Sequence, residues 1–312
     1  GGDAYYMPAV GYVRKDGALA YGVGVFAQGG MGSEYAAGSW VSGGMPLASR
    51  SEVGIGSLIV PISYDVSPDF TIGGSVDFVW GGMDMQTLMP TSATTGMYLD
   101  FSNSNDFSGK AHSTGWAGKL GLTYKVNKQL VVGATYHTET SLGDMEGNAN
   151  MTFWDFATMT ATPTSGKIKV IDFQFPETYG VGLAYQANDK LMIAADYKRI
   201  NWSKTMKTVN FQYTTTGMVV DIPFAQNWDD QDVFQLGVAY KATDALTLRA
   251  GVNISDNPIP DNTVNPLFPA TIKEHYTFGA GYAFNKVSDV NFSYVYAPKV
   301  TVTAPATSGG YS

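Results

Sequence analysis

The sequence predicts an all-β protein, an antiparallel up-and-down transmembrane β-barrel, on three observations. An aromatic residue precedes a short polar turn six times. Apolar and polar residues alternate along most of the segments between these turns. Short turns and long connections also alternate along the chain. This combination is typical of barrels that cross a lipid bilayer, with short turns at one rim and long loops at the other.

The six aromatic residues stand one to three positions ahead of their turns and predict a girdle at one membrane face. They are Tyr12, Tyr64, Tyr124, Tyr185, Tyr240 and Phe284. The turns lie at 15–17, 67–69, 127–129, 188–190, 243–244 and 285–286. Aromatic rings have an apolar body and a polarisable edge, so they suit the boundary between lipid headgroups and hydrocarbon.

Alternation with a period of two predicts the strands. Phe70, Ile72, Val76, Phe78 and Trp80 share one face of a strand, whereas small and polar residues occupy the other face. The same pattern recurs at 116–124, 246–253 and 276–284. Period two places successive side chains on opposite faces of a sheet, which both a sandwich and a barrel require.

The connections decide between the sandwich and the barrel. Long external loops are expected at about 30–50, 84–113, 143–165, 205–229 and 256–270. A soluble sandwich has no reason to separate long connections from short ones, whereas a membrane barrel does. We predict one domain over 1–312 with about twelve strands, at 4–14, 18–29, 51–66, 70–83, 113–126, 130–142, 166–187, 191–204, 231–241, 245–255, 271–285 and 289–303.

Composition narrows the class of protein further. Only 15% of the 312 residues are charged, and 36 are glycine. No apolar run reaches the roughly 18 to 20 residues of a membrane-spanning helix. The net charge of −8 argues against a nucleic-acid partner, which needs a basic surface to replace phosphate counterions. The chain begins Gly1-Gly2-Asp3 without an export signal, so we expect any such signal to have been removed or to lie outside this sequence.

Two basic residues fall on the polar side of their strands. Lys119 and Arg249 must point into the lumen, because on the lipid face each would cost about 2–4 kcal/mol near the midplane. An inward cation is a candidate contact for a substrate carboxylate. The alternative is that these cations pair with the lumenal carboxylates of Asp77, Asp196 or Glu139.

Four segments together resemble the FadL family of outer-membrane transporters for hydrophobic compounds, also called OMPP1/FadL/TodX. They are Phe175-Pro176-Glu177 inside a long strand, the strand 194–203, the strand 248–252 with the loop 256–260, and the strand end 279–285. The resemblance implies a fourteen-stranded barrel with an N-terminal plug. It therefore implies that this chain is a fragment lacking the plug, the first strand and the last strand.

The resemblance also implies a function in the bacterial outer membrane. We expect a monomer in contact with outer-membrane lipid that passively takes up long-chain fatty acids or other lipophilic small molecules, with no catalytic residue and no cofactor. One alternative is an aromatic-hydrocarbon importer of the same family. Another is a non-transport barrel, namely an adhesin, a phage receptor or a lipid-acting enzyme.

The predicted loops at 84–113 and 143–165 are unusually apolar for segments that face water. Their apolar residues include Leu88, Met89, Met97, Leu99, Met151, Phe153, Trp154 and Phe156. One interpretation is that the two loops pack on each other as a lid. The other is a groove that captures an acyl or aryl group, with methionines as adaptable lining. By resemblance, these loops correspond to the initial hydrophobic groove of the family.

Gln28, Gly29 and Gly30 open a stretch with three glycines in four positions at the outer end of a predicted strand. Glycines weaken strand pairing and favour a bulge. The resembling family has a kink in the equivalent strand that makes a lateral exit in the wall. The alternative is that these glycines only begin the loop at 30–50.

No residue pattern predicts catalysis or a metal site. His112, His137 and His275 are the only histidines, and none has carboxylates at the spacing of zinc ligands. A pair of His137 with Ser141 is less consistent with the sequence than a structural lumenal histidine. The acidic run 229–232 has oxygen ligands of the type that calcium prefers, but a solvated strand start explains it better.

Overall fold

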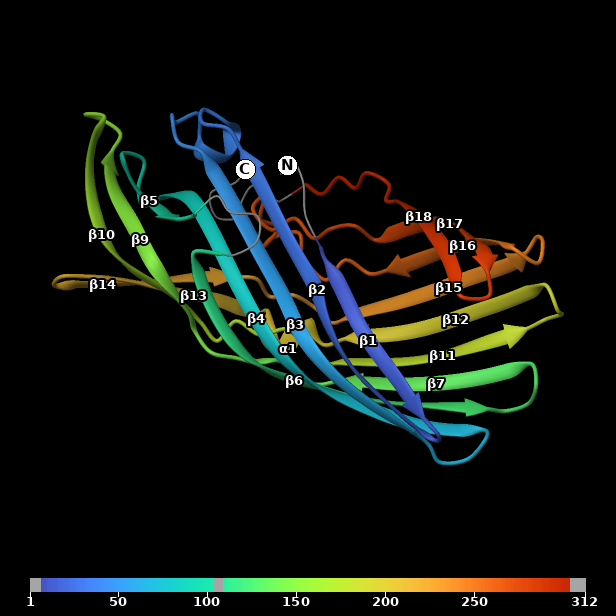
Figure 1. The fold of residues 1–312 in the computed structure, drawn as a ribbon. Helices are drawn as coiled ribbons and strands as arrows, with labels where there is room; N and C mark the ends of the chain where they lie inside the picture. Colours follow the sequence, from blue (N-terminus) through green and yellow to red (C-terminus); the bar gives the residue numbers. More distant parts are fainter. Residues whose placement is uncertain (1–6, 104–108, 304–312) are drawn as a thin grey trace.

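The structure, a computed structural model, describes residues 7–103 and 109–303. These residues form antiparallel sheet almost throughout (Figure 1). The helical elements are a 3-10 turn at Trp40–Ser42 and the four-residue helix α1, Trp202–Thr205. Neither is long and apolar enough to cross a membrane.

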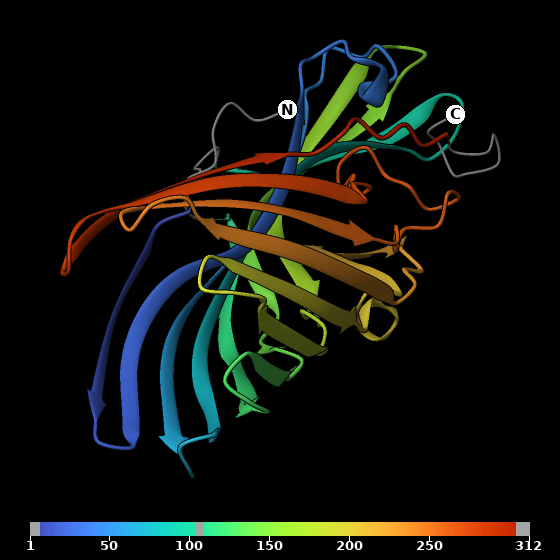
Figure 2. The ribbon, with the colours of Figure 1, turned by 90° about the vertical axis from the view of Figure 1, so that its right-hand side faces the viewer.

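Twelve strands form one continuous curved wall, and each falls within or overlaps one of the twelve predicted ranges. In ladder order they are β1 (Ala9–Asp16), β2 (Leu19–Tyr35), β3 (Ser49–Asp65), β4 (Phe70–Pro90), β6 (Ala111–Lys125), β7 (Leu130–His137), β11 (Thr178–Gln186), β12 (Leu191–Ile200), β15 (Gln231–Lys241), β16 (Leu246–Ser255), β17 (Glu274–Asn285) and β18 (Ser288–Tyr296). Within the described residues no ladder joins β1 to β18, and Figure 2 shows the wall open between this blue strand and this red strand.

The predicted girdle lies at one end of the wall. All six short turns lie at the right of Figure 1, and the distal hairpins point to the left. The six aromatic side chains before the turns are exposed, from 40% at Tyr185 to 65% at Phe284. Their exposure on the outer face agrees with rings at a headgroup boundary.

A second set of strands corrects three of the predicted long loops. These are β5 (Thr95–Phe101), β8 (Ser141–Leu142), β9 (Met145–Asp155), β10 (Thr160–Ile171), β13 (Thr208–Thr215) and β14 (Met218–Ala225). The ladders run β4–β5–β9–β10–β13–β14, and we call β5, β9, β10, β13 and β14 the distal sheet. Segments 84–113, 143–165 and 205–229 are therefore largely strands, because their own apolar residues find a common interior.

The predicted single strand at 166–187 is two strands with different partners. Its first half, in β10, pairs with β9 and β13, and its second half, β11, belongs to the wall. The chain leaves the ladder at Asp172, whose φ of 50° is left-handed, and Pro176 follows with no N–H to donate. The sequence correctly indicates an interruption here, and the interruption separates a strand of the distal sheet from a strand of the wall.

The inward face of β4 changes from polar to apolar along the length of the strand. Asp77 faces inward and is 1% exposed, and the next inward residues are the apolar Val79, Met83 and Met85, all buried. These three belong to one apolar cluster with side chains of β3 and the distal sheet. The wall thus encloses a polar lumen near the turns and an apolar interior far from them.

Candidate functional site

The predicted groove residues lie on the β4–β5 and β9–β10 hairpins, which the β5–β9 ladder joins. Met89, Met97 and Phe153 are cross-strand neighbours in one row. Leu99 and Met151 form the next row on the same face, and both side chains are fully buried. The apolar face therefore continues from the partly buried first row into the interior of the molecule.

The other three predicted residues lie elsewhere. Leu88 and Trp154 are on the opposite face of their strands, and the Phe156 ring covers Gly96 so closely that an added Cβ would come within 2.6 Å of it. Leu88 is buried opposite Tyr98. Burial raises the pKa of the Tyr98 phenol to about 12, so it stays a neutral donor, bonded to the Ala48 carbonyl at 2.9 Å.

A hollow of about 450 Å³ opens at the tips of these hairpins. Three of the eight predicted residues, Met97, Phe153 and Trp154, line it together with threonines of β5 and β10. Leu88, Leu99 and Met151 contribute to packing beneath it. We call this space the tip hollow. The tip hollow is consistent with both interpretations of the apolar loops, a packed lid and a groove, because the hairpins pack on each other and still leave an accessible space.

The first inward cation has a carboxylate partner. Lys119 Nζ lies 3.0 Å from Asp77 Oδ2, and Ser75 Oγ donates to Asp77 Oδ1 at 2.6 Å. The β4–β6 ladder places Ser75 opposite Lys119, which brings the three side chains together on the inner face. Of the alternatives considered for Lys119, the structure shows pairing with Asp77.

The second inward cation is placed differently. Arg249 is exposed to a lumenal hollow of about 840 Å³, whose polar lining also includes Asp196, Asn253 and His275. Its Nη1 donates to the neutral Asn291 Oδ1 at 3.2 Å, and within the described residues it has no ion pair. The inward glycines of β15, β16 and β17 keep this hollow open.

The acidic run is explained by a neighbouring arginine. Arg199 contacts Asp232 Oδ1 and Asp230 Oδ2, each at 3.0 Å, and Tyr197 donates to Asp232 at 2.7 Å. The described part of the chain holds no group of three or more histidine, cysteine or acidic side chains that could bind a metal ion. These contacts favour a structural role for the run at 229–232.

Strand β2 carries a bulge at the predicted place. Its register with β3 shifts between Ala27 and Gly29, which leaves Gln28 as the extra residue. The ladder then continues through Gly30 to Tyr35, so the glycines do not simply begin a loop. On the other side of β2, pairing with β1 ends at Phe26.

A cavity of about 410 Å³ borders the strand just beyond the bulge. Its lining residues are Gly30, Met31, Gly32, Trp202, Trp228, Gln231, Pro258, Pro269, Ala270 and Ile272. The rings of Trp202 and Trp228 meet edge to face with centroids 5.1 Å apart. We call this space the tryptophan cavity. The sequence does not indicate the two tryptophans as site residues, although Trp228 lies within the predicted loop 205–229 and Trp202 lies just before it.

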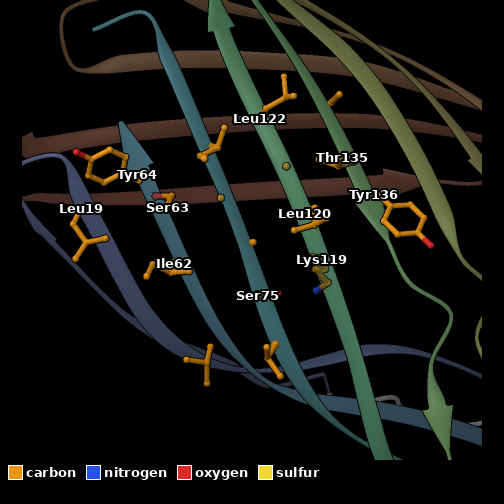
Figure 3. Close-up of a pocket in the computed structure, with 17 residues that line it drawn as sticks. Leu19, Ile62, Ser63, Tyr64, Ser75, Lys119, Leu120, Leu122, Thr135 and Tyr136 are labelled. Carbon is orange, nitrogen blue, oxygen red and sulfur yellow. The ribbon is translucent and has the colours of Figure 1, made fainter. Parts of the chain in front are cut away.

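A further hollow lies on the outer face of the wall near the turns. Gly74 stands between Ile62 and Leu120 in one outward row, and these residues help to line a hollow of about 730 Å³ (Figure 3). Ile62 and Leu120 are both more than half exposed. Their apolar side chains make this surface suitable for contact with lipid tails, so it is separate from the lumenal spaces.

The wall, the aromatic girdle and the apolar interior define a transmembrane β-barrel. The family model described as outer membrane protein transport protein (OMPP1/FadL/TodX) matches residues 4–311. The chain therefore belongs to this family of outer-membrane proteins, whose members are transport proteins and not enzymes.

Two solved structures illustrate the similarity. The Pseudomonas putida toluene transporter TodX is 29% identical with a TM-score of 0.82, over 93% of this chain and 76% of that one. The Ralstonia pickettii toluene transporter TbuX is 28% identical with a TM-score of 0.81, over 96% and 79%.

The curated relatives extend beyond the matched segment. The long-chain fatty acid transport protein of Escherichia coli K12 is 24% identical over 204 residues, which are 62% of this chain and 44% of that protein. Outer membrane protein P1 of Haemophilus influenzae is 25% identical over 58% of this chain and 38% of its own length. The chain thus spans about two fifths of the length of these relatives.

Proposed function

We propose that this chain forms most of the wall of a passive channel that takes hydrophobic small molecules into the outer membrane and out through its side. The observation that carries the proposal is the β2 bulge at Gln28, directly beside the tryptophan cavity. A lipophilic molecule that leaves through the wall passes from one apolar environment to another. It avoids the cost of crossing water, about 0.8 kcal/mol for each exposed methylene.

The proposed path has three stages. The tip hollow receives the molecule, with Met97, Phe153 and Trp154 as the apolar contact surface. The lumenal hollow holds a polar headgroup near Arg249, while the apolar part stays toward the buried cluster. The edge of β2 beyond Gln28 provides the exit into the bilayer. The described contacts of Lys119 favour a structural role for that cation rather than a role in this path.

Two substrate classes fit this path. Long-chain fatty acids are favoured by Arg249, a lumenal cation without a carboxylate partner in the described residues. Monoaromatic hydrocarbons are favoured by the aromatic lining of the tip hollow and by the similarity to two proteins titled toluene transporters. Uptake of radiolabelled palmitate and toluene in competition separates the two classes.

The lateral exit is tested by filling it. An added Cβ at Gly29 meets no atom within 4 Å, so an arginine there extends into open space without a clash at its base. We expect Gly29→Arg to abolish uptake by cells while ligand binding in detergent and barrel folding are preserved. Gly29→Ala is the matched control and should retain uptake. Normal uptake by a correctly folded Gly29→Arg protein would rule out an exit here.

A further inference from the structure

We propose that Phe268 limits the width of the molecules that reach the lateral exit, because its ring divides the apolar interior from the tryptophan cavity. This role rests on the proposed function. Phe268 lines a second, enclosed space of about 20 Å³, which we call the interior pocket. The next two residues, Pro269 and Ala270, line the tryptophan cavity of about 410 Å³. The chain therefore passes from one space to the other at Phe268, and Met31 lines both.

The interior pocket is almost filled by its own side chains. A free volume of about 20 Å³ is close to the space of a single water-sized probe. Four methionines line it, Met31, Met83, Met85 and Met206, together with four phenylalanines. Methionine is unbranched and has three rotatable bonds, so it adapts its shape to a ligand. A hydrophobic molecule can therefore enter this pocket once the methionines move aside, and the boundary of the pocket decides what leaves it.

Two other segments reach both spaces, but they hold each other in place. Met206 and Gln226 line the interior pocket, whereas Trp202 and Trp228 line the tryptophan cavity. The Trp228 backbone N–H donates to the Met206 carbonyl at 3.0 Å. Met206, Gln226 and Trp228 are all buried. These two segments therefore form a fixed part of the boundary between the interior pocket and the tryptophan cavity.

Phe268 differs from these residues because its backbone is held in place while its ring is only partly buried. It lies on the loop between β16 and β17, next to Leu267, which is fully buried. The Ser51 hydroxyl donates to the Leu267 carbonyl, and the Tyr35 hydroxyl donates to the Pro266 carbonyl at 3.0 Å. These contacts anchor the loop immediately before Phe268. The Phe268 ring is therefore a part of the boundary that has room to move.

The test compares two apolar ligands that differ in width, toluene and mesitylene, whose additional ring methyl groups make it broader. Uptake of each radiolabelled compound is measured in cells that make the complete protein, with the heat-modifiable gel shift as the check on folding. Phe268→Ala removes the ring, so we expect the ratio of mesitylene uptake to toluene uptake to rise about fivefold, the low end of the cost of forcing extra volume into a packed site. Phe268→Trp enlarges the ring and should lower the same ratio.

Phe224→Ala is the matched control, because it removes the same ring from the interior pocket at a position on β14 that is also only partly buried. Neither Phe224 nor its chain neighbours belong to the described lining of the tryptophan cavity, so the uptake ratio should stay close to that of wild type. The same change in both alanine variants, or an unchanged ratio in whichever Phe268 variant folds, would overturn the role of Phe268 and leave the proposed function intact. Failure of the wild-type protein to take up either compound would overturn both.

Discussion

The two inward cations of the wall occupy opposite kinds of environment. Lys119 lies on β6 next to the apolar interior, and its partner Asp77 is 1% exposed. Arg249 lies on β16 in the open lumenal hollow and contacts only a neutral amide among the described residues. Two cations placed inward by the same alternation therefore differ in their partners, a buried carboxylate for Lys119 and an exposed amide for Arg249.

The two cations should differ most in how much their replacement lowers the free energy of unfolding. We expect Lys119→Ala to lower the free energy of unfolding by about 3 kcal/mol, because it leaves the buried Asp77 carboxylate without its counter-charge. The value is at the low end of the range for buried pairs, since Lys119 is a quarter exposed. Urea titration of the complete protein refolded in lipid vesicles, followed by the gel shift of the heat-modifiable barrel, measures it.

A matched double variant distinguishes loss of the ion pair from loss of packing. Asp77→Asn combined with Lys119→Met removes both charges and keeps the side-chain volumes, so it should recover much of the lost stability. A double variant as unstable as Lys119→Ala would show that the charge pair is not the reason for the difference.

For ligand binding the order should be reversed, with a larger effect of replacing Arg249 than of replacing Lys119. Arg249→Ala should weaken fatty-acid binding by roughly 1.5 to 3 kcal/mol, the range for a hydrogen bond to a charged group, and leave uncharged hydrocarbon binding nearly unchanged. Its effect on the free energy of unfolding should stay within about 0.5 kcal/mol, as at other exposed positions. Calorimetry with palmitate and toluene gives the binding values, with Arg249→Lys as the charge-retaining control. Equal losses for both ligands would instead indicate a structural role.

The contact between Arg249 and Asn291 should have the smallest effect. Asn291→Ala removes one exposed hydrogen bond to the guanidinium and should change the free energy of unfolding by less than about 0.5 kcal/mol. Palmitate affinity should change less than threefold in the same calorimetric assay. A loss as large as that of Arg249→Ala would mean that Asn291 holds the arginine in its binding position.

The wall was largely predictable from sequence because each of its strands faces two different environments. Lipid on one side and a polar lumen on the other impose alternation with a period of two, and the turns end each pair of strands within a few residues. The bulge at Gln28 was predictable for a local reason, since glycines weaken pairing. The Lys119–Asp77 pair was among the alternatives considered because inward charges need partners.

The distal sheet was not predicted, although its signal is present. Val209, Phe211 and Tyr213 alternate with polar residues and are buried, and the turn at Gly217 has a φ of 76°. The length of these connections predicts loops, whereas their alternating apolar side chains form strands because the fold gives them a common interior. The contact between Trp202 and Trp228 could not be predicted at all, because it depends on how the fold brings the two rings together.

The two longest insertions in the wall lie between β7 and β11 and between β12 and β15, and this has a consequence for how the chain assembles. Tyr136 of β7 pairs with Tyr179 of β11, and Leu191 of β12 pairs with Tyr240 of β15, whereas most other wall pairs are joined by short turns. Closing a longer loop costs more chain entropy, by about 0.6 kcal/mol for each doubling of its length. The β9–β10 and β13–β14 hairpins shorten these loops once they have formed. The local hairpins should therefore form first during folding, and the β7–β11 and β12–β15 ladders should form last.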